Sequence, residues 1–133
     1  MRVIIAGSRG ITDIRHVEEA MHRAGLDVTE VVSGTARGVD QLGERWAGAR
    51  GIPVARFPAQ WERYGRSAGY KRNDLMTRYA AAGPRGGALV AVWDGTSPGT
   101  SHTIELARRQ GLQVFIHRPG VPRPERALEA SHT

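Results

Sequence analysis

The chain lacks cysteine, which excludes disulfides, zinc–thiolate sites and thiol nucleophiles. Its five histidines show no metal-ligand spacing, so we expect no metal site built by the protein alone. No apolar run approaches the ~20 residues that a membrane helix needs. The N-terminus leads directly into a strand pattern without a signal segment. We therefore expect a cytoplasmic protein with no membrane partner.

Lysine is almost absent as well. Lys71 is the only lysine among 19 basic residues, and the net charge is +6. A basic chain favours anionic partners, which range from nucleotides to nucleic acid. Because the arginines are scattered and not gathered in blocks, we expect a small anionic ligand, with nucleic acid as the weaker expectation. The sequence is compatible with a homo-oligomer but does not determine the oligomeric state.

Segments typical of strands and of helices alternate along the chain. We expect strands at about residues 2–6, 29–32, 54–57, 88–93 and 113–117. We expect helices from Thr12 or Asp13 to Gly25, and at about 39–51, 68–82 and 101–111, with a long connection at 58–69. This order predicts a Rossmann-like, doubly wound α/β fold, with a mostly parallel five-stranded sheet and helices on both faces. Residues 1–117 are expected to form one domain, and residues 118–133, with three prolines, a flexible tail.

Three short loops rich in Gly, Ser and Thr each follow an expected strand. They are Gly7–Gly10, Ser33–Gly38 and Asp94–Ser101. Their glycines allow backbone N–H groups to approach a phosphate, and the helix after each loop adds unpaired N–H donors. Because the carboxyl ends of parallel strands share one edge of the sheet, we expect one shared pocket for a phosphorylated ligand. If the strand at 2–6 is central, the first and third loops face each other.

Residues in and near these loops make up the predicted ligand site. Arg9 stands at a strand-to-helix turn, where its guanidinium could pair with phosphate oxygens. Arg72 extends the expected buried stripe of Leu75 and Met76 toward the strand ends, so we expect it to face the pocket. The predicted ligand residues are Gly7, Ser8, Arg9, Ser33, Gly34, Thr35, Arg37, Gly38, Asp40, Lys71, Arg72, Asn73, Asp94, Gly95, Ser97, Gly99, Thr100 and Ser101.

Two carboxylates near the third loop are candidates for chemistry. Asp94 could accept hydrogen bonds from ribose hydroxyls or help to hold Mg²⁺ through water, and Mg²⁺ arriving with a nucleotide is the one cofactor we consider. Glu105 is expected on the outer face of its helix, paired with Arg109 four residues later. The expected inward stripe of that helix is Thr100, Ser101, Ile104, Ala107 and Gly111.

Aromatic residues are interleaved with basic ones in and after the connection at 58–69. Trp61, Tyr64 and Tyr70 alternate there with Arg63 and Arg66. These side chains could stack on a base. They could equally form an ordinary lid packed on the sheet edge, and the sequence leaves both alternatives open.

Four motifs together resemble a known family. They are Ala6-Gly7-Ser8-Arg9, Ser33-Gly34-x-Ala36-x-Gly38-Val39-Asp40, Gly69-Tyr70-Lys71-Arg72-Asn73 and Trp93-Asp94-Gly95-x-Ser97-x-Gly99-Thr100. Over about residues 1–117 the chain resembles the YspA/YpsA-related branch of the SLOG superfamily, which also contains DprA and the LOG phosphoribohydrolases. The resemblance implies a Rossmann-like domain that binds nucleotide-derived ligands.

One function is favoured and two alternatives stay open. The favoured function is binding of a nucleotide or nucleotide-derived phosphorylated ligand at the strand C-termini, as a ligand-binding or sensor domain. Pro98-Gly99-Thr100 and Lys71-Arg72-Asn73 are similar to motifs of the LOG enzymes. This similarity implies a phosphoribohydrolase-like enzyme that cleaves nucleoside monophosphates. In that enzyme Arg72 would hold the phosphate, and Asp94 or Glu105 would stabilise an oxocarbenium-like centre. The third function is DprA-like binding of single-stranded DNA.

Overall fold

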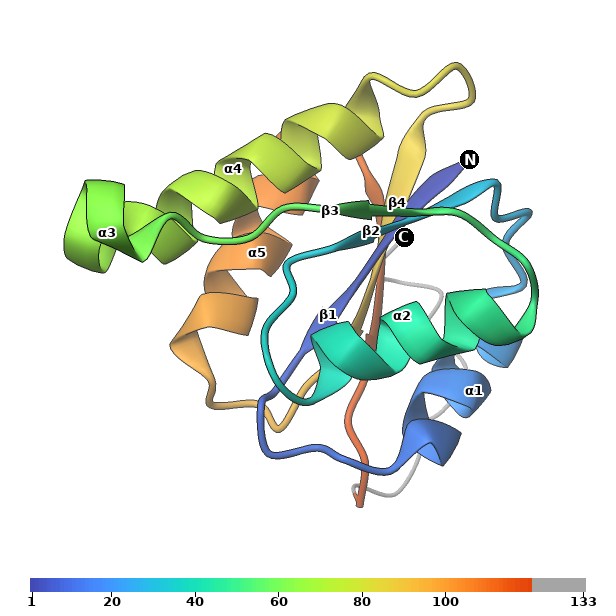
Figure 1. Cartoon of the computed structure of the whole chain (residues 1–133). Helices are drawn as coiled ribbons and strands as arrows, with labels where there is room; N and C mark the ends of the chain where they lie inside the picture. Colours follow the sequence, from blue (N-terminus) through green and yellow to red (C-terminus); the bar gives the residue numbers. More distant parts are fainter. Residues whose placement is uncertain (121–133) are drawn as a thin grey trace.

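A computed structural model describes residues 1–120 and shows a five-stranded sheet between two layers of helices (Figure 1). The strands are β1 (Arg2–Gly7), β2 (Glu30–Ser33), β3 (Val54–Arg56), β4 (Gly87–Val92) and β5 (Gln113–His117). The helices are α1 (Ile14–Ala24), α2 (Val39–Ala49), α3 (Trp61–Tyr64), α4 (Ala68–Ala81) and α5 (Pro98–Arg109), with a 3-10 turn η1 (Gly65–Ser67). The predicted tail at 118–133 lies, from residue 121 onward, outside the described residues.

Neighbouring strands of the sheet are all parallel, in the order β3-β2-β1-β4-β5. The strand β1 is therefore central, between β2 and β4. The chain leaves β1 toward β2 and leaves β4 toward β5, so the strand order reverses between β1 and β4. This confirms the predicted Rossmann-like, doubly wound α/β fold. Sheets of this kind bind ligands at the carboxyl ends of the strands where the order reverses.

Each face of the sheet is covered by two helices (Figure 1). The helices α1 and α2 pack on one face, against side chains such as Val3 and Val90. The helices α4 and α5 pack on the other face, against Ile4 and Leu89. Every residue of β4 is buried, which explains its continuous apolar sequence. Among residues 1–120, no helix has both the length and the apolar character that crossing a membrane requires.

Local signals in the sequence set the ends of two helices. Asp13 caps α1, because its carboxylate accepts a hydrogen bond from the backbone N–H of Arg15 at 3.0 Å. Gly25 ends α1 with a φ of +60°. The helix α5 begins at Pro98, earlier than the predicted start near Ser101. Proline suits the first position of a helix, where the missing N–H would have no partner.

Three helix positions predicted to be buried are exposed. Leu75 in α4 is 55% exposed, because the buried face of α4 is formed by Asn73, Met76, Thr77 and Ala80, from which Leu75 is rotated away. Ser101 and Gly111 are exposed as well. The face of α5 that packs on the sheet contains Thr100, Thr103, Ile104 and Ala107, so Thr103 is buried and Ser101 is not. The predicted connection at 58–69 also contains the short α3 and η1.

Candidate functional site

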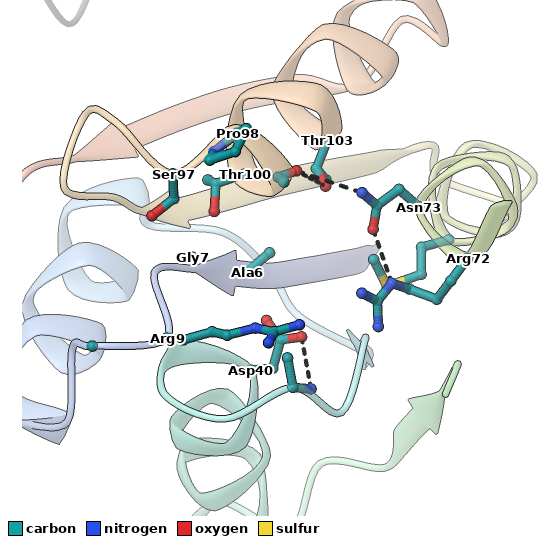
Figure 2. Close-up of a pocket in the computed structure, with 14 residues that line it drawn as sticks. Ala6, Gly7, Arg9, Asp40, Arg72, Asn73, Ser97, Pro98, Thr100 and Thr103 are labelled. Carbon is teal, nitrogen blue, oxygen red and sulfur yellow. Dashed lines mark hydrogen bonds between the residues drawn. The ribbon is translucent and has the colours of Figure 1, made fainter. Parts of the chain in front are cut away.

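A cleft lies at the carboxyl ends of the central strands, at the predicted switch point (Figure 2). Its volume is about 400 Å³, within the range of roughly 300–1,000 Å³ of small-molecule sites. All three predicted loops and the helix α4 contribute to its wall. The lining residues are Ala6, Gly7, Arg9, Gly10, Ala36, Asp40, Arg72, Asn73, Met76, Ser97, Pro98, Gly99, Thr100 and Thr103.

Ser8 joins the first loop to the third loop. Its hydroxyl accepts a hydrogen bond from the backbone N–H of Asp94 at 2.9 Å and lies 3.2 Å from the hydroxyl of Ser97. Its own backbone N–H donates to the carbonyl of Val92 at 3.1 Å. Ser8 is only 2% exposed. It therefore supports the cleft from behind the wall.

Asp94 shapes the third loop. Its carboxylate accepts hydrogen bonds from the backbone N–H groups of Thr96 at 2.8 Å and Ser97 at 2.9 Å, and also from both hydroxyls. The two backbone hydrogen bonds, followed by those of the hydroxyls, hold the pKa of Asp94 well below its ordinary value. The charged carboxylate thus organises the turn that leads into α5. Contact of Asp94 with ribose hydroxyls or Mg²⁺ stays a prediction.

The second loop is held against the first loop through the backbone. The carbonyl of Ser8 accepts hydrogen bonds from the backbone N–H groups of Ile11 at 3.3 Å and Val39 at 3.4 Å. Gly38 passes so close that a Cβ there would lie 2.5 Å from the carbonyl oxygens of Ser8 and Arg9, and its φ is +74°. A residue with a side chain would therefore force these two loops apart.

Ser33 is engaged on the side of the second loop away from the cleft. Its hydroxyl donates to the carboxylate of Glu44 at 2.6 Å and accepts a hydrogen bond from the backbone N–H of Thr35 at 3.1 Å. The same carboxylate forms an ion pair with Arg56 at 2.9 Å. The hydroxyl of Ser33 is thus used to fix the loop to α2 and β3.

Arg72 reaches from α4 to the second loop. Its Nη1 donates to the carbonyl of Gly34, and its Nε donates to the side-chain oxygen of Asn73 at 2.9 Å. A Cβ at Gly34 would lie 2.8 Å from both Arg72 Nη1 and Asp40 Oδ2, so glycine leaves the room for these two groups. Burial lowers the pKa of Arg72, while the charge of Asp40 opposes that change. The guanidinium stays protonated, as it does in proteins generally.

Among the described residues that line the cleft, Asp40 is the only one with a carboxylate. It is 5% exposed, and its Oδ2 accepts a hydrogen bond from the backbone N–H of Ala36 at 3.1 Å. Burial raises the pKa of Asp40 to about 6. The hydrogen bond from Ala36 and the charges of Arg72 and Arg9 counter this rise in part, and the charge of Glu44 adds to it.

The N-terminus of α5 meets the cleft from the side opposite Asp40 (Figure 2). At the N-terminus of α5, the backbone N–H of Ser101 donates a hydrogen bond to the carbonyl of Ser97 at 3.2 Å. The N–H groups of Gly99 and Thr100 come before it, where a helix has no internal partner to offer. Thr100 is 6% exposed, and within residues 1–120 its hydroxyl makes no hydrogen bond. This hydroxyl points into the cleft in Figure 2.

The structure divides the predicted ligand residues into two groups. Those that line the cleft are Gly7, Arg9, Asp40, Arg72, Asn73, Ser97, Gly99 and Thr100. Those that do not line it are Ser8, Ser33, Gly34, Thr35, Arg37, Gly38, Lys71, Asp94, Gly95 and Ser101. Lys71 instead lies over the ring of Tyr64, 5.0 Å from its centre, and Arg37 is exposed. Ligand contact by any member of either group stays a prediction.

Glu105 lies apart from the cleft. Its side chain is 60% exposed and pairs with Arg109 at 3.4 Å, which confirms the predicted surface pair. It borders a separate open depression together with Tyr70 and His102. Within residues 1–120, no three His, Asp or Glu side chains gather in a way that could hold a metal ion.

The prediction missed several cleft residues: Ala6, Gly10, Ala36, Met76, Pro98 and Thr103. The hydroxyl of Thr103 donates to the carbonyl of Gly99 at 3.1 Å, and the amide of Asn73 approaches the same carbonyl at 3.4 Å. These contacts fix the first turn of α5. Thr103 could have been found from its spacing, since it stands three residues after Thr100 on one helix face.

The aromatic residues of the segment around α3 stay outside the cleft. Trp61, Tyr64 and Tyr70 are 52%, 37% and 53% exposed, and α3 projects beyond the sheet in Figure 1. The guanidinium of Arg63 lies 5.1 Å from the centre of the Tyr64 ring. These exposures contradict a lid packed on the sheet edge. Stacking of these rings on a base stays a prediction.

Comparison with known proteins agrees with the motifs. The profile of the YAcAr family, described as the YspA, cpYpsA-related SLOG family, matches residues 1–64. The chain is 35% identical over 123 residues to the Gene 61 protein of Mycobacterium phage D29, covering 86% of this chain and 94% of the phage protein. No solved structure is significantly similar to the chain. The chain belongs to the YspA, cpYpsA-related SLOG family.

Proposed function

We propose that this protein binds a nucleotide-derived phosphorylated ligand as a ligand-binding or sensor domain, with the phosphate at the N-terminus of α5. The observation that carries the proposal is the hydroxyl of Thr100. Thr100 is 6% exposed, and its hydroxyl makes no hydrogen bond within residues 1–120 and points into the cleft. The N–H groups of Gly99 and Thr100 stand beside it without helical partners. A phosphate would satisfy all three donors.

The charges around the cleft favour an anion at this position. A helix N-terminus carries a partial positive charge, and phosphates bind there through backbone N–H groups. Arg9 and Arg72 face the same space from the first loop and from α4. Membership in the SLOG family supports a nucleotide-related ligand. A nucleotide brings both the anion and enough bulk to fill a cleft of about 400 Å³.

The two carboxylates predicted for the phosphoribohydrolase alternative, Asp94 and Glu105, do not line the cleft. Glu105 lies outside the cleft in a separate depression. Asp94 is occupied by hydrogen bonds within its own loop. The proposal is therefore binding without cleavage. Incubation with nucleoside monophosphates, followed by chromatography of the free base, is expected to show no release.

The binding proposal is tested by thermal unfolding with a panel of AMP, ADP, ATP and the matching guanine, cytosine and uracil nucleotides. Free nucleosides serve as the comparison. A nucleotide at about 100 times its dissociation constant is expected to add roughly 2.7 kcal/mol to the free energy of unfolding, and nucleosides much less. Failure of every nucleotide to raise the melting temperature would contradict the proposal.

Variants locate the phosphate within the cleft. Thr100→Val removes the free hydroxyl and keeps the shape of the side chain. Arg72→Ala removes a guanidinium, and should weaken nucleotide binding by about 1.5–3 kcal/mol, the scale of hydrogen bonds to charged groups. Arg109→Ala is the matched control, because Arg109 pairs with Glu105 on the outer face of α5. Equal losses in the two arginine variants would indicate attraction by net charge alone.

A further inference from the structure

Asp40 has a polar atom that the folded chain does not use. The residue lines the cleft and is 5% exposed. Its Oδ2 accepts the hydrogen bond from the backbone N–H of Ala36 at 3.1 Å. Within residues 1–120 its Oδ1 accepts no hydrogen bond. Among the described residues this oxygen is not one of the fully buried side-chain atoms without a partner, so it reaches the open space of the cleft and can accept a hydrogen bond from a ligand there.

The neighbouring charges do not occupy that oxygen. Neither Arg9 nor Arg72 lies within 4.0 Å of the Asp40 carboxylate as an ion pair, among the described residues. Arg72 directs two of its donors to the carbonyl of Gly34 and the side chain of Asn73. Glu44 lies on α2 four residues after Asp40, and its carboxylate is bonded to Ser33 and Arg56. The carboxylate is therefore open toward the cleft.

A carboxylate in this position restricts what a phosphorylated ligand can place against it. Its negative charge repels a phosphate, which is thereby directed to the α5 end of the cleft. The ligand group facing Asp40 must donate a hydrogen bond. The donors in a nucleotide are the sugar hydroxyls, the amino groups of the bases and the ring N–H groups of guanine and uracil. Within residues 1–120, no aromatic side chain on which a base could stack lines the cleft, which favours the sugar.

We propose that Asp40 accepts a hydrogen bond from a ribose hydroxyl of the bound ligand, and that the cleft thereby selects ribonucleotides over 2′-deoxyribonucleotides. This inference rests on the proposed function, since it places the sugar between Asp40 and a phosphate at α5. Figure 2 shows Asp40 and Thr100 on opposite walls of the cleft. A charged acceptor opposite an anion site fits a ligand whose phosphate and hydroxyl groups lie on either side of one sugar ring.

The test is calorimetric titration at pH 7.5 with AMP, CMP, GMP and UMP, each paired with its 2′-deoxy counterpart, and with pyrophosphate as a probe without sugar. The wild-type protein is expected to bind the ribose member of a pair at least about tenfold more tightly, the scale of one hydrogen bond to a charged group. Asp40→Asn should reduce that preference several-fold, because a hydrogen bond to a neutral acceptor is weaker than one to a charged group. The same variant should bind pyrophosphate more tightly, because a repelling charge is removed.

Asp27→Asn is the matched control. Asp27 carries the same charge on an exposed side chain that pairs with Arg85 and is not among the residues lining the cleft. This variant is expected to keep both the ribose preference and the pyrophosphate affinity of the wild type. Comparison of the two variants therefore distinguishes an effect of the carboxylate at position 40 from an effect of the net charge.

Five results would overturn the inference. Equal wild-type binding of ribose and deoxyribose members would do so, without affecting the proposed phosphate site. A ribose preference that persists undiminished in Asp40→Asn would also do so. The same holds if affinity depends on the amino group of the base, which is tested by comparing the binding of AMP with that of IMP. Loss of pyrophosphate binding in Asp40→Asn would show that Asp40 only supports the loops. If the wild type binds neither pyrophosphate nor any nucleotide, the proposed function fails as well.

Discussion

Three polar residues hold the loops in place behind the cleft wall. Ser8 bonds to the third loop, Ser33 bonds to Glu44, and Asp94 bonds to the turn before α5. Their substitution would act on a ligand through the position of the loops. Thr100 and Asp40 differ, because each lines the cleft with a polar atom that has no partner within residues 1–120. These two residues are the ones whose exchange should change ligand preference directly.

The raised pKa of Asp40 predicts a pH dependence of stability. Burial raises the pKa from 3.8 to about 6, so between these values the folded state binds the proton more tightly than the unfolded state. The free energy of unfolding should therefore rise as pH falls from 7 to 4, by up to about 3 kcal/mol from this group. Asp40→Asn should remove this increase and raise the melting temperature at pH 8.

Chemical denaturation at pH 4, 5, 6, 7 and 8 measures this effect, compared between the wild type, Asp40→Asn and Asp27→Asn. Asp27 is exposed, so its variant should follow the wild type through the whole range. An Asp40→Asn protein with an unchanged pH profile would show that Asp40 has an ordinary pKa in the folded protein. The prediction concerns the unligated protein and is independent of any ligand.

At the level of elements, the floor of the cleft depends on how closely β1 approaches β4. The last residues paired between them are Gly7 and Val92. A Cβ added to Gly7 would collide with the carbonyl oxygen of Val92 and lie 2.9 Å from a side-chain carbon of Val39. The strand end and the start of α2 thus meet at a position where only glycine fits. The loop that carries Ser8 and Arg9 starts from this point.

Gly7→Ala is expected to destabilise the fold by about 1–3 kcal/mol or more, the cost of forcing extra atoms into a packed interior. Gly10→Ala is the control, since a Cβ at Gly10 would have no atom within 4 Å. That variant should change the free energy of unfolding by no more than about 0.5 kcal/mol. Denaturant titration of both proteins measures the difference. Similar stabilities would contradict the tight contact between β1 and β4.

At the level of the whole molecule, the net charge of +6 and the exposed aromatic residues around α3 are the features that favour single-stranded nucleic acid. Several surface arginines are already paired with carboxylates, including Arg78 with Asp74 and Arg109 with Glu105. The cleft has a volume suited to one small ligand, about 400 Å³. We therefore expect the nucleotide to be preferred over a polynucleotide strand.

Fluorescence anisotropy with a labelled single-stranded oligonucleotide at near-physiological salt is expected to show only weak binding. The binding constant should fall as the salt concentration rises. A plot of the logarithm of one against the logarithm of the other should have a slope of about −0.7 for each phosphate neutralised. Trp61→Ala should leave nucleotide binding unchanged, because Trp61 does not line the cleft. Submicromolar binding that Trp61→Ala weakens, and that mononucleotides do not displace, would favour the DNA-binding alternative.

Much of the fold and the place of the site could be predicted from the sequence alone. The continuous apolar run of β4 reflects burial on both faces, and the signals at Asp13 and Gly25 act within one helix. Alternating strands and helices require a parallel sheet, and parallel strands bring the three glycine-rich loops to one edge. These properties depend on residues that are close in the chain, so the sequence by itself determined the fold class and the location of the cleft.

The tertiary structure decided which polar groups face the cleft. Ser8 and Thr100 are similar in the sequence, since each is a small hydroxyl residue in a glycine-rich loop. Ser8 is occupied because the third loop brings Asp94 to it from 86 residues away. The hydroxyl of Thr100 and the Oδ1 of Asp40 stay available because no described residue donates or accepts a hydrogen bond at these two atoms. Partners of this kind are set by packing across the sheet, and no local pattern of residue types contains that information.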